Sequence, residues 1–170
     1  MRTAVEKALE ELVEVVPAGV DGFYYQGQEL KDKKCKEVEV FKGIDTLHKL
    51  YAVLRKSWSS STAYKSCQSE WVSEDPSYGQ CAITATLVYD MFGGSIHRIR
   101  VEDGGTHYFN KIAGQYVDLT REQFDLYNIE VAYEPNETMQ REYCCKNSDT
   151  NARYRQLQRN IIAYLKNNED

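Results

Sequence analysis

The amino-acid sequence predicts an α+β fold in which helices accompany an antiparallel sheet. Three observations lead to this prediction. Apolar residues recur at helical spacing in several separate segments, an apolar run follows Cys81, and three short strand-like segments succeed one another between residues 96 and 119. Strands joined by short turns pair in antiparallel fashion. At 170 residues, the chain is long enough for one domain with a substantial core.

The composition is that of a soluble globular protein, with 42% hydrophobic and 28% charged residues. The formal net charge of −5 argues against a surface that neutralises phosphate, so nucleic acid and acidic membranes are not expected partners. The N-terminus lacks the apolar core of a signal peptide, and no apolar run is long enough to span a bilayer. We expect a cytoplasmic protein, whose oligomeric state the sequence leaves open.

The first quarter of the chain is predicted to contain one helix and two short strands. Residues 3–16 carry one apolar stripe, and Thr3 with Glu6 fits a capping box at its start. Residues 23–25 and 38–41 are strand-like and flank a charged stretch that is expected to be a solvated loop. No catalytic chemistry is recognisable here.

The remaining elements follow in order. Helical spacing marks residues 45–58, which Asp45 or Thr46 is placed to cap, and the apolar run 83–92 is a helix that Gly93 and Gly94 stop. Further strands and helices are predicted at residues 96–101, 106–112, 116–119 and 129–133 (strands) and at 122–124 and 151–165 (helices).

Cys81 lies where a loop containing proline and glycine, residues 76–82 (PSYGQCA), enters the apolar helix. The free amides and positive dipole end of a helix N-terminus favour a thiolate over a thiol, and the thiolate is the reactive form. The sequence therefore predicts a nucleophilic cysteine at this position.

His107 and Asp118 are candidates for the partner base and its orienting carboxylate, and hairpin geometry tests the pair. A two-residue turn at Ala113 and Gly114 sets the sum of paired residue numbers at 227, so Asp118 lies opposite Phe109. His107 and Asp118 are then diagonal neighbours on one face, roughly 7 to 8 Å apart at the backbone. A three-residue turn would put them on opposite faces.

In this scheme the Cys81 thiolate attacks a carbonyl carbon, His107 carries the thiol proton to the leaving group, and Asp118 fixes the imidazole. The Cys81 amide is one oxyanion donor, and the Gln80 carboxamide is a candidate second donor or a cap for the loop. Each residue also has a structural interpretation: a buried thiol, a hydrogen-bonded strand histidine and an aspartate that caps the next turn.

The other cysteines and histidines are assigned to structure. The five cysteines are an odd number without the spacing of a disulfide framework, so Cys35, Cys67, Cys144 and Cys145 are expected to be free thiols. His48 and His97 have no matching partners in the sequence. Metal-ligand spacings are absent from the sequence, and no cofactor or metal is expected.

Several motifs together resemble the YunG-like family of small bacterial proteins: residues 76–85 (PSYGQCAITA), 90–94 (DMFGG), 107–110 (HYFN), 117–124 (VDLTREQF) and 147–154 (NSDTNARY). The similarity covers most of residues 44–165. It implies a YunG-like domain at 44–170, with residues 1–43 as an N-terminal extension of the same compact unit.

More distantly, a helix cysteine followed by a strand histidine and a strand aspartate resembles the transglutaminase-like branch of the papain-like cysteine hydrolases. This resemblance implies a nucleophile helix packed on the antiparallel sheet. It does not imply a substrate, because one fold hosts many functions.

Three functions are compatible with the sequence. The leading hypothesis is a cysteine-dependent acyl-transfer enzyme that acts on a peptide, protein or small amide as a peptidase, deamidase or transglutaminase-like enzyme. The alternative is a catalytically inactive binding or scaffold protein. A redox thiol protein is a third option, but no resolving cysteine lies near Cys81 in the sequence.

Overall fold

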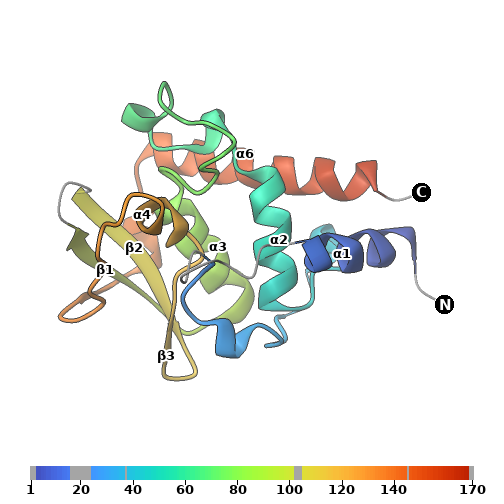
Figure 1. The fold of residues 1–170 in the computed structure, drawn as a ribbon, viewed down its shortest axis with the longest axis horizontal. Helices are drawn as coiled ribbons and strands as arrows, with labels where there is room; N and C mark the ends of the chain where they lie inside the picture. The colour runs from blue at the N-terminus through green and yellow to red at the C-terminus, as the bar shows by residue number, and fades with distance from the viewer. Residues whose placement is uncertain (1–2, 16–23, 37, 102–104, 145, 169–170) are drawn as a thin grey trace.

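The computed structural model describes residues 3–15, 24–36, 38–101, 105–144 and 146–168. It has the predicted α+β architecture, with an antiparallel sheet at one side of the molecule and α1 at the other (Figure 1). Helices α2 and α3 lie between them, and the long C-terminal helix α6 runs along the same side of α2 and α3. Within the described residues, no helix is both long enough and apolar enough to cross a membrane.

The sheet has four strands in the order β3-β2-β1-β4, and every neighbouring pair is antiparallel. The strands are β1 (Ser95–Val101), β2 (Gly105–Ile112), β3 (Gln115–Val117) and β4 (Glu137–Met139). The outer strands β3 and β4 have three residues each, so each covers only part of its longer neighbour. This leaves β2 without a strand partner on one side before Asn110.

The β2–β3 hairpin has the predicted register. Asn110 pairs with Val117, and Ile112 pairs with Gln115, which gives the expected sum of 227. The two turn residues, Ala113 and Gly114, have φ values of 50° and 79°. Two successive left-handed residues are the signature of a type I′ turn, whose twist matches that of the strands it joins.

The helices are α1 (Ala4–Val15), α2 (Leu47–Ser57), α3 (Cys81–Phe92), α4 (Glu122–Asp125), α5 (Arg141–Cys144) and α6 (Ser148–Asn167). The predicted capping box is present, since Glu6 donates its amide to Thr3 Oγ1 while Thr3 donates its amide to the Glu6 carboxylate. Of the two candidate caps for α2, it is Thr46 that accepts the Lys49 amide. Residue 16, at the end of the first predicted helix, lies outside the described residues.

Two predicted strands are wrong, and a third is only partly described. Residues 39–41 form a 3-10 turn that buries Phe41, and residues 129–133 form no ladder. The apolar alternation at 129–133 has another cause, because Ile129, Val131 and Tyr133 pack on a cluster around Phe109. An alternating apolar pattern shows that one face of a segment is buried. A segment that covers a sheet without pairing in it has the same pattern as a paired strand. The short edge strand β4 was not predicted.

The third of these segments was predicted at residues 23–25, of which 23 lies outside the described residues. Its neighbour Gln26 forms an isolated bridge with Asp118.

The main core is built around α2. Its residues Leu47, Leu50 and Leu54 are completely buried, and they share one hydrophobic cluster with residues before and after α2 in the chain. Those partners include Leu9, Tyr25, Phe41, Leu87, Val117, Leu157 and Ile161. The segment before α2 is therefore part of the same core as α3 and α6.

Helix α3 packs on the sheet at β2. The Asn110 carboxamide donates to the Ala85 carbonyl (2.9 Å), and Ile96 of β1 joins Ala85 in a small buried cluster. Gly94, just after the helix, comes so close to β2 that a Cβ there would lie 2.2 Å from the Lys111 carbonyl oxygen. These contacts hold the Cys81 helix against the strand that carries His107.

Candidate active site

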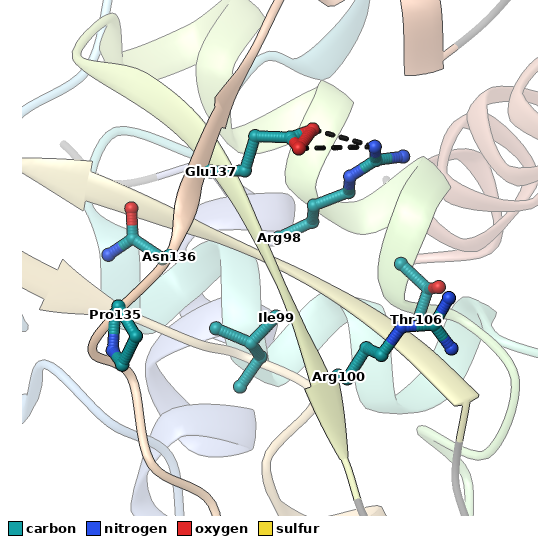
Figure 2. A pocket seen from close by; sticks show the side chains of 7 residues that line it. All are labelled: Arg98, Ile99, Arg100, Thr106, Pro135, Asn136 and Glu137. Carbon is teal, nitrogen blue, oxygen red and sulfur yellow. Dashed lines mark hydrogen bonds and ion pairs between the residues drawn. The ribbon is translucent and has the colours of Figure 1, made fainter.

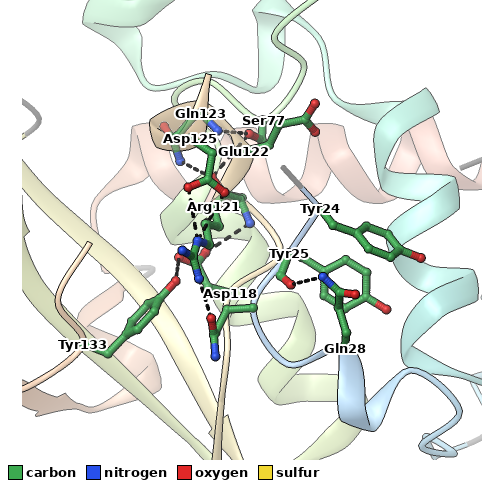
Figure 3. Close-up of polar contacts among 12 residues, drawn as sticks. Tyr24, Tyr25, Gln28, Ser77, Asp118, Arg121, Glu122, Gln123, Asp125 and Tyr133 are labelled. Carbon is green, nitrogen blue, oxygen red and sulfur yellow. Dashed lines mark hydrogen bonds and ion pairs between the residues drawn. The ribbon is translucent and has the colours of Figure 1, made fainter. Parts of the chain in front are cut away.

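Cys81 is the first residue of α3 and is half-buried as a whole residue. The loop before it is fixed to the segment that follows β3. Ser77 donates to the Thr120 carbonyl (3.3 Å) and accepts the Gln123 amide (3.1 Å), and Figure 3 shows Ser77 beside Gln123. The Gln123 side chain accepts the Gly79 amide. The start of the Cys81 helix and the end of the His107 hairpin are thus held together by hydrogen bonds.

His107 and Asp118 form a buried pair. The Nε2 atom of His107 lies 2.7 Å from Asp118 Oδ2, and each side chain is 1% exposed. The hydrogen bond follows from the hairpin register, which places both residues on one face of the sheet. Phe124 meets the imidazole edge to face, with ring centroids 4.7 Å apart.

Asp118 has three further partners. Tyr133 donates its hydroxyl to Oδ2 (3.0 Å), and Thr120 donates its amide (3.1 Å) and hydroxyl (3.2 Å) to Oδ1. The backbone of Asp118 exchanges two hydrogen bonds with Gln26. Asp118 therefore orders the following turn, as the structural interpretation expected, and also holds His107.

His107, Asp118 and Cys81 shift one another's pKa values. Burial disfavours the imidazolium, but the Asp118 carboxylate and the Cys81 thiol outweigh it and raise the pKa of His107. Burial likewise raises the pKa of Asp118, but His107, Tyr133 and the Thr120 amide bring it below its usual value. Together these shifts favour an imidazolium–carboxylate pair.

The pKa of the Cys81 thiol also depends on the His107–Asp118 pair. Burial raises its pKa, but a hydrogen bond and the charge of His107, together with the Tyr108 amide, lower it below the ordinary thiol value. Because Asp118 takes Nε2 of the imidazole, Nδ1 is the nitrogen left for Cys81. Nδ1 is buried and makes no hydrogen bond of standard geometry to any described residue, Cys81 included.

The Tyr108 amide was not a sequence-level candidate. It is available because β3 ends at Val117, opposite Asn110, so that β2 has no strand partner on that side at Tyr108. Tyr133 was also missed, since its role depends on a chain segment that folds back over the sheet. The alternation at 129–133 indicates that Tyr133 faces the sheet, but it does not identify Asp118 as its partner.

Gln80 is completely buried beside Cys81, and its carboxamide is engaged at both ends. Nε2 donates to the Ser59 carbonyl (3.0 Å), and Oε1 accepts the Thr62 hydroxyl (2.7 Å). The side chain thus supports the loop after α2. A second N–H on Nε2 is left over, and an oxyanion role for it stays a prediction.

A pocket of about 720 Å³ opens at Cys81 and His107. Three tyrosines on its wall are more than a third exposed: Tyr64, Tyr127 and Tyr143. Cys67 and Cys144 line the same pocket, although they are far from Cys81 in the sequence. Cys81 therefore lines a cavity large enough for a side chain or short peptide segment.

The other histidines lie outside this pocket. The Tyr24 and Tyr25 hydroxyls lie 2.9 Å from ring nitrogens of His48. His97 contacts Ser95 (2.7 Å) and Asn136 (2.8 Å) through its two nitrogens. No group of three or more His, Cys, Asp or Glu side chains in the described part of the chain is arranged to hold a metal ion.

Comparison with known proteins gives one family. A family model described as "YunG protein" matches residues 46–166, a range that includes Cys81, His107 and Asp118. The "Uncharacterized protein YunG" of Bacillus subtilis (strain 168) is 42% identical over 72 residues, which are 42% of this chain. The chain covers 57% of the length of that relative. No solved structure matches the chain.

Proposed function

This chain belongs to the YunG family, and we propose that it is a cysteine-dependent acyl-transfer enzyme acting on an amide. Cys81 is the nucleophile, His107 the acid and base, and Asp118 the group that orients the imidazole. The observation that carries the proposal is the buried His107–Asp118 hydrogen bond, with His107 and Cys81 lining one pocket of about 720 Å³.

The first half of the reaction forms a thioester. The Cys81 thiolate attacks the amide carbonyl carbon and makes an S–C bond, and the carbonyl electrons move onto oxygen. When the intermediate collapses, the C–N bond breaks and the amine leaves with the proton from His107. Asp118 keeps the imidazole in place through Nε2, so that Nδ1 faces the thiol.

The second half releases the acyl group. His107, now neutral, takes a proton from water or from an amine, which attacks the thioester carbonyl and expels the Cys81 thiolate. Attack by water makes the protein a peptidase or deamidase, and attack by an amine makes it a transglutaminase-like transferase. The exposed tyrosines around the pocket favour a peptide or protein substrate over a small amide.

The oxyanion is stabilised at the start of α3. The first amides of a helix have no intrahelical acceptor, so the Cys81 amide can donate to developing negative charge. Gln80 supplies the second donor through its remaining N–H. Loss of one such donor typically reduces kcat by about 10²- to 10³-fold.

The arrangement is also that expected for a transglutaminase-like, papain-like fold, in which a helix starting at the nucleophile packs on an antiparallel sheet with histidine and aspartate on adjacent strands. This similarity supports the proposal as an analogy. We place the protein in the cytoplasm, where a reducing environment keeps a reactive thiolate in its active form.

The first test is the alkylation rate of Cys81 by iodoacetamide as a function of pH, followed by mass spectrometry. We expect a thiol pKa clearly below the free value of about 8.5, rising in His107→Ala. Cys35 is the internal reference, because it donates to the Ile44 carbonyl (3.2 Å) and its burial raises its pKa. Cys67 is unsuitable as a reference because it lines the same pocket.

A slow Cys81 that does not respond to His107→Ala would overturn the proposal. In that case the alternative function, a binding or scaffold protein that uses the pocket without catalysis, would be favoured. A fast Cys81 justifies screening of peptide amides, in which Cys81→Ala must abolish turnover.

A further inference from the structure

The wall of the Cys81 pocket is positively charged, although the chain as a whole carries a net charge of −5. Arg98, Lys146 and Arg153 line the pocket, and no Asp or Glu in the described part of the chain does so. The carboxylate of Asp118 is buried behind His107 and is not part of the lining. A pocket with this charge attracts anions, whereas most of the acidic protein surface repels them.

Two of these cations each lie close to the same aromatic ring. The Arg98 guanidinium lies 5.2 Å from the centroid of the Tyr143 ring, and Lys146 Nζ lies 4.3 Å from it. We call Arg98, Tyr143 and Lys146 the cationic wall. Helix α5, which carries Tyr143, is held against α3 by an ion pair. Arg141 of α5 makes a bidentate pair with Asp90 of α3 (2.6 and 2.8 Å).

The ion pairs of the three lining cations indicate how much positive charge is available to bind a ligand. Arg98 is paired with Glu137 (2.6 Å), and Arg153 is paired with Asp149 (3.1 Å). Lys146 makes no ion pair with any described residue. Within the described residues, about one positive charge of the pocket lining is thus left without a counterion, which matches a singly charged carboxylate better than a doubly charged phosphate.

A second pocket of about 520 Å³ adjoins the first and extends the positive surface. The two pockets share Arg98 and Thr106, and the second also contains Arg100 and Glu137 (Figure 2). In that view the Arg98 side chain reaches toward Glu137, while Arg100 lies beside Thr106. Arg100 is exposed and is in none of the ion pairs formed by the described residues.

We propose that the cationic wall selects acyl donors that carry a carboxylate close to the attacked amide, as an acidic peptide segment does. The carboxylate binds between Arg98 and Lys146 while the amide carbonyl reaches Cys81, and Tyr143 contacts the chain between them. This specificity rests on the proposed acyl-transfer function, since it concerns the substrate of that same thiol.

The test uses two alkylating reagents that differ in charge. Iodoacetate carries a carboxylate and iodoacetamide is a neutral amide of nearly the same shape, and with both of them the thiolate displaces iodide and forms a C–S bond. The measured quantity is the ratio of the iodoacetate rate to the iodoacetamide rate at Cys81. Mass spectrometry follows the intact full-length protein at low ionic strength, with Cys35 as the internal reference.

We expect Lys146→Gln to lower this ratio about fivefold, the factor for one charge lost at about 4 Å in a solvated site. Lys146→Arg should retain the wild-type ratio. Lys56→Gln is the matched control, because Lys56 is an exposed lysine of α2 that does not line either pocket. High salt should reduce the difference between the wild type and Lys146→Gln.

The Arg98 side of the wall is tested with the double variant Arg98→Gln, Glu137→Gln, which removes both members of the ion pair and leaves no unpaired charge. We expect it to lower the ratio as well.

Two failures can be distinguished. If Cys81 reacts rapidly with iodoacetamide but the ratio in Lys146→Gln and in the double variant equals that in Lys56→Gln, the carboxylate specificity is wrong and the acyl-transfer function stands. If neither reagent modifies Cys81 faster than Cys35, both proposals are overturned.

Discussion

Asp118 is the residue on which the site depends most, because it combines a structural task with the orienting role proposed for it. Its side chain holds His107, Tyr133 and Thr120, and its backbone pairs with Gln26. A buried charge of this kind is stable only while its partners remain, and removal of one partner leaves the others uncompensated.

We expect Asp118→Asn to destabilise the fold by about 3 to 5 kcal/mol, the usual cost of breaking a buried ion pair. The effect depends on pH. The raised pKa of His107 stabilises the fold below its unfolded value of about 6.5, and this contribution is lost as pH rises through the folded value. The lowered pKa of Asp118 contributes above about 3.9 and is lost as pH falls.

The difference in unfolding free energy between wild type and Asp118→Asn should therefore be largest between about pH 4 and 6.5 and decrease above that range. Urea unfolding at several pH values measures it. Asp45→Asn is the control, since the side chains of Asp45 and its partner Lys34 are 51% and 71% exposed and such a pair is worth about 1 kcal/mol or less. A difference that is constant with pH would contradict the ion-pair explanation.

At the residue scale, the sequence predicted those positions that depend only on neighbouring residues in the chain. The position of Cys81 at a helix N-terminus and the alignment of His107 with Asp118 follow from a glycine-containing loop and a two-residue turn. Tyr133, Cys67 and Lys146 could not be predicted in the same way. They reach the pocket through contacts between distant chain segments, and no periodicity specifies those contacts.

Among the elements, the connection from α3 to β1 fixes how α3 lies on the sheet. Gly93 and Gly94 both have positive φ, of 76° and 75°. Only Gly94 also lies against β2, where a Cβ would come within 2.2 Å of the Lys111 carbonyl oxygen. Around Gly93, by contrast, no atom of any described residue beyond its chain neighbours lies within 4 Å of such a Cβ.

We expect Gly93→Ala to cost about 1 to 3 kcal/mol, which is the strain of an alanine in a region of backbone space suited to glycine. Gly94→Ala should cost clearly more, because the strand backbone must also move. Thermal unfolding of both variants measures the difference. Gly94→Ala should also slow Cys81 alkylation, since the helix is displaced relative to His107; equal stability of the two variants would show that the approach is not tight.

Prediction of elements succeeded where the residue pattern is specific to one backbone conformation. It failed where apolar residues are buried by contacts other than strand pairing. The helix with a capping box and the tight hairpin were predicted correctly. Residues 129–133 alternate because they cover the sheet, and Phe41 is buried by a 3-10 turn. The three-residue strand β4 is too short to have a pattern of its own.

In the whole molecule, the segment before residue 44 takes part in the core that the matched family region forms. Leu9, Tyr25 and Phe41 are buried against α2 and its neighbours, and Gln26 holds the backbone of Asp118. The family match begins at residue 46, so this contribution comes from a part of the chain outside it.

We expect removal of residues 1–43 to abolish cooperative folding. Each large apolar side chain that is lost contributes about 1.5 to 3 kcal/mol of burial, and several are lost from a total stability of typically 5 to 15 kcal/mol. Circular dichroism during heating detects the loss. Removal of residues 1–15 alone should be milder, because Tyr25, Gln26 and Phe41 remain. A cooperative transition in the chain without residues 1–43 would show that the family region folds alone.

The two-residue turn at Ala113 and Gly114 has a consequence for how such chains can vary. Side chains of a strand alternate between faces with a period of two. A loop lengthened by two residues keeps His107 and Asp118 on a common face, whereas a loop lengthened by one residue separates them unless a bulge compensates. Relatives that retain the pair should therefore differ in hairpin loop length mainly in steps of two, and an odd step would mark a member that has lost the arrangement.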